Sequence, residues 1–236
     1  MSVKFRLFAG PNGSGKSTLF QSLRKQKIIH TELYVSADRI EAELKEKFRF
    51  YFNAYRVRSS REELLAHITT SGLFSVIPDK NAFLKQFHLE GGVLTLKTKK
   101  INSYHASFIA AYLVEKLLES KQSFCFETVM SHRSKVQLLD TANGLGYKTY
   151  MYYLYTSDVD INIGRVKMRA EQGEHDVPEE KIISRYKRTL KLLPDALKIA
   201  QTAYVIDTSD YPSVVVLSKK DGKVIKYHKL PAITGL

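Results

Sequence analysis

The stretch that decides the fold is Gly10-Pro11-Asn12-Gly13-Ser14-Gly15-Lys16-Ser17-Thr18. It satisfies the pattern G-x-x-x-x-G-K-[ST] at every fixed position. The apolar run of residues 3–9 before it predicts a buried strand, and residues 16–25 after it predict a helix with one apolar face. Because strand, loop and helix follow in the order that this motif requires, we predict a phosphate-binding loop.

The residue types in the loop have a physical explanation. Glycines let the backbone curl so that successive N–H groups point inward, and the helix that follows directs the positive end of its dipole at an anion. Lys16 then supplies a charge to the β- and γ-phosphates of ATP, and Ser17 supplies a hydroxyl for Mg²⁺. We therefore expect the nine residues of the motif to bind ATP, with Ser17 as the metal ligand.

The remaining pattern predicts an α/β fold. Strands are expected at residues 33–36, 123–128, 148–155 and 203–207, alternating with helices at 37–57, 104–119, 135–142, 159–171 and 179–200, the last bent or broken near Pro194. Asp221-Gly222 predicts a C-terminal antiparallel hairpin between residues 214–218 and 223–228. This alternation favours a three-layer phosphate-loop fold with a mainly parallel sheet.

One region is irregular. Residues 59–102 read as a helical insertion, with helices expected at 62–70 and 81–88, and residues 93–99 as either a strand or an exposed arm. The aromatics of residues 48–55 favour a core role over a base-stacking one. With 236 residues, the chain is long enough for one such domain, 1–236.

Composition limits the classes of function. The formal net charge of +13 predicts attraction to polyanions or phosphorylated small molecules. A single cysteine, Cys125, excludes an intrachain disulfide framework and a cysteine-rich zinc site, and its place in a core strand favours a buried small hydrophobe. No run approaches the ~20 apolar residues of a membrane helix, and we expect a cytoplasmic protein with no membrane partner.

Several classes of phosphate-loop protein lack support. The chain has neither the Asn-Lys-x-Asp segment nor the Asp-x-x-Gly switch of a GTPase. Leu89-Glu90-Gly91-Gly92-Val93 lacks the serine of a transporter ATPase signature, and the chain is short for a helicase core. A small kinase remains, and it needs acidic groups for the acceptor hydroxyl and the metal, and arginines over the phosphates.

Two carboxylates stand at the ends of predicted strands. Asp38 follows residues 33–36, and Glu127 ends the apolar strand at 123–128. The carboxyl ends of strands in an open parallel sheet face the ligand crevice, so both can meet an acceptor hydroxyl. The alternatives are a helix-dipole residue for Asp38 and a capping carboxylate for Glu127. Thr128, Ser131 and His132 continue the same loop as Glu127.

Arginines gather in the predicted lid, residues 159–190. Arg165 and Arg169 stand four residues apart and share a helix face, while Arg185 and Arg188 follow the loop at residues 173–178. A helix–loop–helix of this composition suits a lid that closes on phosphates. A solvated basic face explains the same spacing.

Taken together, these motifs resemble the zeta toxin family of phosphate-loop kinases. The resemblance runs from Val3 to about Asp207, apart from the irregular middle. It is carried, in order, by the phosphate loop, Ser36-Ala37-Asp38-Arg39-Ile40, Phe126-Glu127-Thr128-Val129-Met130-Ser131, Gly144-Leu145-Gly146-Tyr147, Arg165-Val166-Lys167-Met168-Arg169, Gly173-Glu174-His175-Asp176-Val177-Pro178 and Ser184-Arg185-Tyr186.

This resemblance implies an adenylate-kinase-like fold with sheet order 2-3-1-4-5. It also implies a kinase that uses ATP and Mg²⁺ to phosphorylate a hydroxyl of a nucleotide sugar such as UDP-N-acetylglucosamine, and often a small antitoxin partner. In that case Asp38 resembles the general base and Lys16 the phosphate clamp. Glu127 and Thr128 resemble the acceptor site, with Ser131 and His132 beside them.

Arg165 and Arg169 resemble the charge-stabilising pair of the family, and His175 lies in the lid loop. The acceptor stays open, because residues 59–102 match nothing in the family pattern. A kinase of a nucleoside or of a nucleic-acid end is one alternative, although nucleic acid is not the favoured partner. A non-catalytic ATP-binding regulatory protein is another.

Overall fold

The structure is a computed structural model that describes residues 2–173 and 176–227. The chain forms two compact units. The first combines Met1–Tyr34 with Ser123–Leu236, and the second is Val35–Gln122. The organisation of residues 1–236 as one domain with an insertion at 59–102 stays a prediction.

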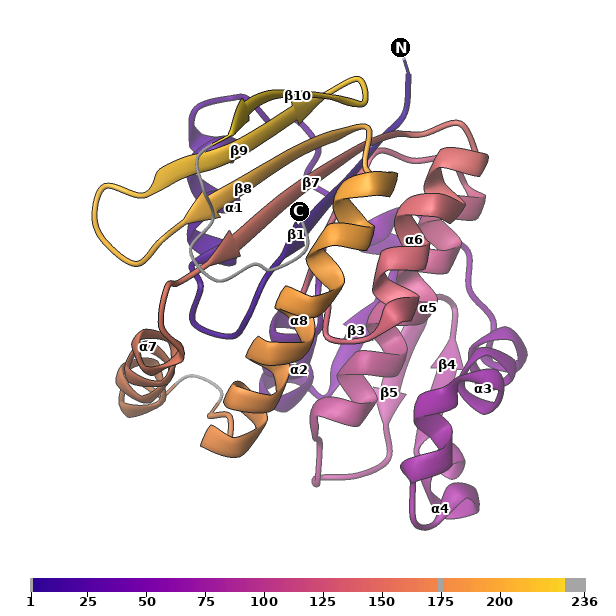
Figure 1. The fold of residues 1–236 in the computed structure, drawn as a ribbon. Helices are drawn as coiled ribbons and strands as arrows, with labels where there is room; N and C mark the ends of the chain where they lie inside the picture. The colour runs from indigo at the N-terminus through magenta and orange to yellow at the C-terminus, as the bar shows by residue number, and fades with distance from the viewer. Residues whose placement is uncertain (1, 174–175, 228–236) are drawn as a thin grey trace. The chain divides into compact units, whose positions relative to one another are not determined.

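A seven-stranded sheet is the centre of the first unit (Figure 1). Its order is β10-β9-β8-β7-β1-β6-β2. The strands are β1 (Lys4–Ala9), β2 (Tyr34–Ser36), β6 (Phe124–Thr128), β7 (Lys148–Tyr155), β8 (Thr202–Asp207), β9 (Val214–Lys220) and β10 (Lys223–Tyr227). Of the residues of β2, Tyr34 belongs to the first unit, and the second unit begins at Val35.

The directions of the strands confirm a mainly parallel sheet. β1 pairs in parallel with β6 and β7, and β7 pairs in parallel with β8, whereas β9 is antiparallel to both β8 and β10. Counted along the chain without the hairpin, the order β2-β6-β1-β7-β8 is the expected 2-3-1-4-5. The C-terminal hairpin extends this sheet, as the Asp221-Gly222 turn predicts.

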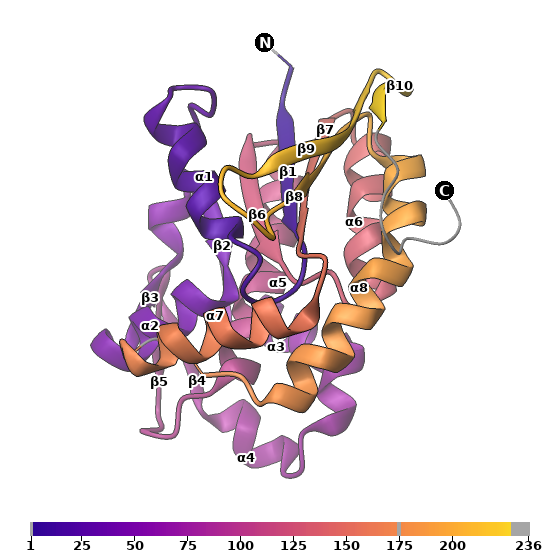
Figure 2. The same cartoon turned by 60° about the vertical axis from the view of Figure 1, so that its left-hand side comes forward.

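Helices cover the two faces of this sheet in three layers (Figure 2). On one face lies α1 (Lys16–Lys25), whose Phe20 ring meets Phe8 edge-on at 5.6 Å. On the other lie α6 (Arg133–Gly144) and α8 (Glu179–Ile199), and α7 (Val159–Glu171) precedes α8. α8 is not broken at Pro194 but continues through it as one helix.

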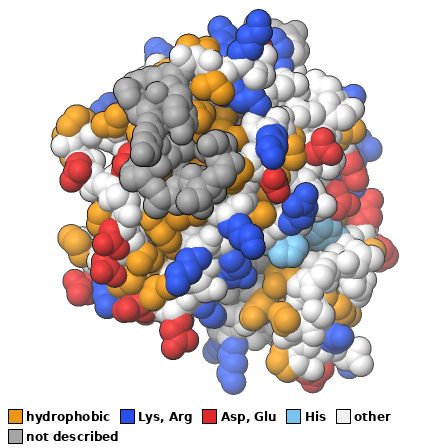
Figure 3. All heavy atoms as spheres, viewed as in Figure 1, with side chains coloured by type: hydrophobic (Ala, Val, Ile, Leu, Met, Phe, Trp, Pro, Cys, Tyr) orange, Lys and Arg blue, Asp and Glu red, His pale blue; other side chains and the backbone are white. Residues whose placement is uncertain are grey.

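Basic side chains concentrate on the outer face of α6 and α8 (Figure 3). The exposed cations there include Arg133, Lys187, Arg188, Lys191 and Lys198. Arg133 forms an ion pair with Asp195 at 3.1 Å. Part of the net charge of +13 is therefore spread over a solvated helical face.

The second unit is built around a long apolar helix, α5 (Ser103–Glu119). Its other elements are α2 (Ala37–Lys47), β3 (Arg49–Tyr51), the 3₁₀ helix η1 (Phe52–Tyr55), α3 (Arg61–Thr70), the 3₁₀ helix η2 (Gly72–Val76), α4 (Lys80–Lys85), β4 (Phe87–Glu90) and β5 (Val93–Leu96). The strands form an antiparallel sheet in the order β3-β5-β4.

This unit corrects two expectations about secondary structure. The helix expected at 37–57 ends at Lys47, because Phe48 takes a left-handed conformation with φ 55°. The helix expected at 81–88 is present as α4 but ends at Lys85, before β4, and residues 93–96 form the partner strand of β4 rather than an exposed arm. The insertion is therefore not only helical. Pairing of alternating apolar residues across the small sheet overrides the helical pattern, as Leu89 opposite Leu94 illustrates.

Candidate active site

The phosphate loop leaves β1 at Ala9 and enters α1 at Lys16. Two of its glycines lie against other parts of the backbone. A Cβ on Gly10 (φ +136°) would stand 1.9 Å from the carbonyl oxygen of Leu154, and one on Gly13 (φ +75°) would stand 2.7 Å from that of Asn162. No side chain fits at either position, so the curl of the loop depends on glycine there.

Polar side chains from α7 and from the end of β8 hold the loop in place. Asn162, fully buried, donates from Nδ2 to the carbonyl oxygen of Asn12 at 2.6 Å, while its Oδ1 accepts from the hydroxyl of Thr156. Thr208 donates from Oγ1 to the carbonyl oxygen of Ser14 at 3.2 Å. The loop is therefore fixed by residues that follow it by some 150–194 positions in the chain.

The buried polar atoms of the loop fit a phosphate ligand. Lys16 is 7% exposed, and its Nζ donates to the carbonyl oxygen of Pro11 at 2.7 Å, so its charge lies within the curl. The hydroxyl of Ser14 is buried without a hydrogen-bond partner among the described residues. A buried donor of this kind and a buried cation favour an anion such as a phosphate oxygen.

Glu127 meets the loop from the carboxyl end of β6. Its Oε2 accepts a hydrogen bond from Ser17 Oγ at 2.8 Å and another from the hydroxyl of Tyr34, and the residue is 9% exposed. A carboxylate and a hydroxyl side by side are the oxygen ligands that Mg²⁺ takes, either directly or through water. The residues present therefore fit Mg²⁺. The described residues hold no group of three or more His, Cys, Asp or Glu placed to bind a metal by themselves.

The other residues predicted for the acceptor lie in several places. Thr128 and Ser131 are half-buried after Glu127, and His132 is the exposed N-cap of α6, where its ring accepts from the N–H of Ser134 at 3.2 Å. Asp38 belongs to the second unit, exposed in the first turn of α2. His175 lies outside the described residues. The roles assigned to all five stay predictions.

The predicted arginine pair lies on α7, with both side chains half-buried. Arg165 donates from Nη2 to the carbonyl oxygens of Thr208 and Ser209, at 2.7 and 3.2 Å. It thus ties α7 to the same segment that holds the phosphate loop. Arg169 stands one turn further along the helix. A direct role of either guanidinium on phosphate stays a prediction.

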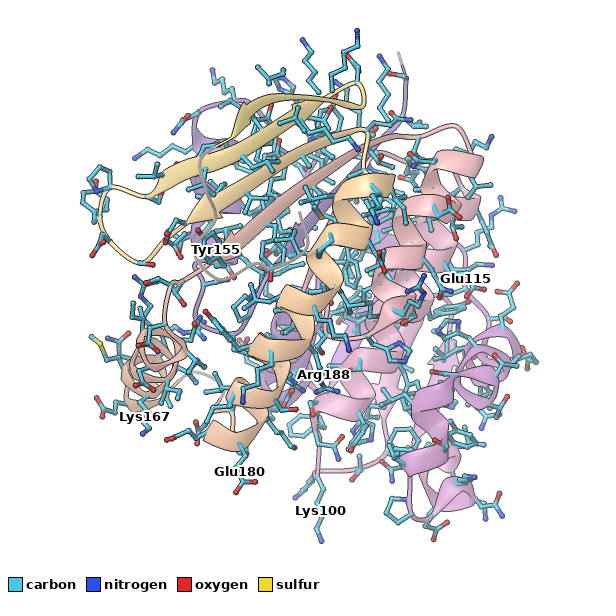
Figure 4. The ribbon with its side chains drawn as sticks, viewed as in Figure 1. Lys100, Glu115, Tyr155, Lys167, Glu180 and Arg188 are labelled. Carbon is cyan, nitrogen blue, oxygen red and sulfur yellow. The ribbon has the colours of Figure 1, made fainter. Side chains whose placement is uncertain are left out.

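Burial shifts the titration of groups around the sheet. Tyr155 ends β7 (Figure 4), and burial, with the Asp207 carboxylate adding to it, raises the pKa of its phenol above the ordinary value. Burial also raises the pKa of Cys125 to about 12. This thiol is fully buried in β6, so it acts as the small hydrophobe that its position predicts and not as a nucleophile.

Three residues of the site carry no motif in the sequence: Tyr34, Asn162 and Thr208. Tyr34 starts the strand before Asp38, and its ring stacks on Phe20 at 3.9 Å. Asn162 and Thr208 act on the loop through its backbone carbonyls, which any residue supplies. In the sequence, Asn162 is recognisable only as a polar residue on a predicted apolar helix face, and Thr208 only as a polar residue just after a core strand.

Comparisons with known proteins show the fold. No family model matches the chain. A chain of the AvrRxo1-ORF1:AvrRxo1-ORF2 complex solved with ATP aligns with a TM-score of 0.60 at 13% identity, over 95% of this chain and 60% of that chain. The same complex with sulphate ions gives a TM-score of 0.59 at 12% identity, over 95% and 61%. At such identities the likeness establishes the fold, which is the predicted α/β phosphate-loop architecture.

Other matches are looser or shorter. A chain from the PezAT chromosomal toxin–antitoxin system of Streptococcus pneumoniae aligns with a TM-score of 0.48 at 13% identity, over 88% of this chain and 68% of that chain. An uncharacterized protein of Haemophilus influenzae is 32% identical over 63 residues, 27% of this chain and 45% of that protein. The chain thus spans less than two thirds of the Haemophilus protein and of the AvrRxo1 chains.

Among the described residues, no helix combines the length and the apolar character needed to cross a membrane.

Proposed function

We propose that the chain is a kinase of the zeta toxin kind, which transfers the γ-phosphate of ATP to a hydroxyl acceptor. The observation that carries this proposal is the 2.8 Å hydrogen bond between Ser17 and Glu127 at the mouth of the glycine curl around Lys16. It brings together a predicted metal ligand in the first turn of α1 and an acidic residue near the end of β6. The likeness in fold to the complex solved with ATP supports the choice of nucleotide.

Three residues of the loop, Ser14, Lys16 and Ser17, have distinct roles in this proposal. Lys16 offsets charge on the β- and γ-phosphates from within the curl, and the hydroxyl of Ser14 donates to a phosphate oxygen. Mg²⁺, when bound by Ser17 and Glu127, supplies Lewis-acid stabilisation of the phosphate charge. Tyr34 fixes the direction of the Glu127 carboxylate through its hydrogen bond.

We propose a nucleotide sugar such as UDP-N-acetylglucosamine as the acceptor, on the strength of the resemblance in the motifs. Asp38 then accepts the proton of the attacking hydroxyl, Thr128, Ser131 and His132 line the acceptor side, and Arg165 with Arg169 offsets charge in the transition state. A protein antitoxin is the proposed partner, because the AvrRxo1 structures are complexes of two proteins.

The experiment that tests the function follows labelled γ-phosphate from ATP into a panel of nucleotide sugars, nucleosides and oligonucleotides. We expect Asp38→Asn to lower turnover by about 10²-fold or more, since general bases contribute on that scale, while the Kd for ATP stays unchanged. Glu46→Gln, an exposed carboxylate on the same helix, is the matched control and should retain full turnover.

Different results identify the alternatives. Transfer to a nucleoside or to an oligonucleotide end would replace the nucleotide sugar as acceptor. ATP binding without a labelled product from any acceptor would favour a regulatory ATP-binding protein. Unchanged turnover in Asp38→Asn would remove Asp38 from the mechanism.

A further inference from the structure

One face of the seven-stranded sheet carries a concentration of cations and tyrosines that the proposed kinase does not use. They lie toward the amino ends of the parallel strands, opposite the end that holds the phosphate loop. We call this set the basic–aromatic platform. Its members are Lys4, Arg6, Lys148, Tyr150, Tyr204, Ser218, Lys220 and Lys223.

Strand register places these side chains on one face. Arg6 is paired with Tyr150, Tyr152 with Tyr204, and Lys220 with Lys223, and residues paired across strands point the same way. The neighbouring Lys219 points to the other face, where its Nζ donates to the carbonyl oxygen of Leu197 in α8 at 2.6 Å. The platform therefore belongs to the face that α1 covers in part.

Three aromatic rings on this face, those of Phe8, Tyr152 and Tyr204, form a stacked row. Tyr152 stacks on Phe8 at 4.9 Å and on Tyr204 at 5.4 Å, with interplanar angles of 13° and 16°. Phe8 and Tyr152 are buried, whereas Tyr204 and Tyr150 are half-buried. The row therefore starts in the core and ends at the partly open ring of Tyr204, while Tyr150 lies against Arg6.

Arg6 is the unusual member. It is only 7% exposed, its guanidinium lies 5.2 Å from the centre of the Tyr150 ring, and among the described residues it has no carboxylate or hydrogen-bond partner. A largely desolvated guanidinium without a carboxylate partner can pair with an anion, and the tyrosine ring offsets its desolvation only in part. The site therefore favours an anionic ligand that reaches Arg6.

The charged members of the platform around Arg6 are all cations. Lys148, Lys220 and Lys223 are exposed and Lys4 is half-buried. Among the described strand positions of this face, the one carboxylate is Glu127, at the opposite end beside Ser17. Side chains that end in nitrogen extend from the end of the sheet at the β9–β10 turn (Figure 4).

We propose that the basic–aromatic platform binds single-stranded nucleic acid. Bases can stack on the partly open rings of Tyr150 and Tyr204, while phosphates meet Arg6 and the surrounding lysines. A double helix hides the faces of its bases, and an anionic lipid surface offers no rings to stack, so neither uses both features. This proposal is independent of the kinase activity.

The test measures fluorescence anisotropy of the full chain with a labelled 15-nucleotide oligothymidine and with a blunt duplex of equal length. We expect the single strand to bind more tightly. Tyr204→Leu and Tyr150→Leu should each weaken it by about 5- to 150-fold with the salt slope unchanged, because a base loses its stacking partner. Lys148→Glu should reduce the slope of log Kd against log salt by about 0.7 or more.

Lys187→Glu and Lys191→Glu, exposed cations of α8, are the matched controls for net charge and should bind nearly as the unmodified chain does. Lys148→Glu changes only an exposed side chain, so it keeps the test valid if a tyrosine variant fails to fold. The proposal is overturned if Lys148→Glu and Lys187→Glu weaken binding equally. It is also overturned if the duplex, or vesicles containing phosphatidylserine, compete better than the single strand.

Discussion

The phosphate loop and the second unit, Val35–Gln122, reach their structures by different routes. In the loop, nine consecutive residues define the chemistry. Two of its glycines lie so close to the backbone of Leu154 and of Asn162 that no other residue fits. In the second unit no such motif exists. Phe52 and Phe83 instead pack on Tyr112 and Phe108 of α5, at 5.5 and 5.6 Å.

This difference bears on how each region tolerates change. A backbone contact cannot adjust to an added methyl group, whereas a packed core adjusts in part. The loop should therefore be sensitive at few positions and severely so. The second unit should be sensitive at many positions, each to a smaller extent.

Gly10→Ala should have the largest effect. The added Cβ would stand 1.9 Å from the carbonyl oxygen of Leu154, at a φ of +136° that alanine avoids, so we expect a loss of about 3–5 kcal/mol in the free energy of unfolding. Gly164→Ala, inside α7 with open space around its Cβ, is the control and should gain up to about 1 kcal/mol. Urea unfolding of both variants measures the contrast, and equal stabilities would contradict it.

Tyr34→Phe should lower turnover without disturbing the fold. It removes the hydrogen bond to Glu127 but keeps the ring stacked on Phe20. Since small displacements of a positioned group are costly in catalysis, kcat should fall about ten- to hundredfold, with KM for ATP nearly constant. Tyr104→Phe in the second unit is the control. A rise in KM for ATP at constant kcat would show that Tyr34 serves the nucleotide and not Glu127.

The sequence predicts the first unit far better than the second. The strand at residues 148–155 and the helix at 159–171 have the predicted bounds, because long periodic segments between clear turns leave few alternatives. The order of the parallel strands came from the resemblance, and the structure confirms it. In the second unit, Phe48 turns left-handed and sends residues 49–51 into a strand. That strand pairs with β5, a partner that the local sequence does not reveal.

The same limit applies within the site. Lys16, Ser17 and Glu127 are predicted from local patterns, and the structure brings Ser17 and Glu127 together. The contacts that Asn162 and Thr208 make with the loop could not be predicted, since each supports the loop from a distant part of the chain through a backbone carbonyl. Only the tertiary fold reveals such contacts.

His105 should give the second unit a measurable pH dependence. It is 1% exposed, Nδ1 accepts from the N–H of Asn102, and Nε2 lies 2.8 Å from Gln86 Oε1, so burial holds the pKa of the imidazole below its ordinary value. As pH falls below about 6.5, the unfolded chain takes up a proton that the folded chain resists. His105 therefore leaves the free energy of unfolding at its full value above that pH. Below it, the free energy of unfolding falls by at most about 1.4 kcal/mol per pH unit because of His105.

The measurement compares urea unfolding at pH 7.5 and 5.5. His105→Gln should reduce the loss of stability between the two pH values. His88 is an exposed imidazole on β4 and serves as the control. His88→Gln should lose as much stability between the two pH values as the unmodified chain does. If both variants keep the full loss, His105 does not titrate between these pH values.

The smallest effect should come from the exposed ion pair between Lys167 of α7 and Glu179 of α8. In Figure 4, the labels of Lys167 and Glu180 mark these two helices. Lys167 Nζ lies 2.9 Å from Glu179 Oε2, but the two side chains are 63% and 52% exposed, so solvent screens the pair. A double-mutant cycle of Lys167→Ala and Glu179→Ala should give a coupling below about 0.5 kcal/mol.

In the second unit, Lys116 is 18% exposed and contacts Glu119 at 2.9 Å and Glu63 at 3.4 Å. Its coupling to Glu119 should exceed that of the first pair, and the reverse order would show that burial does not set these energies.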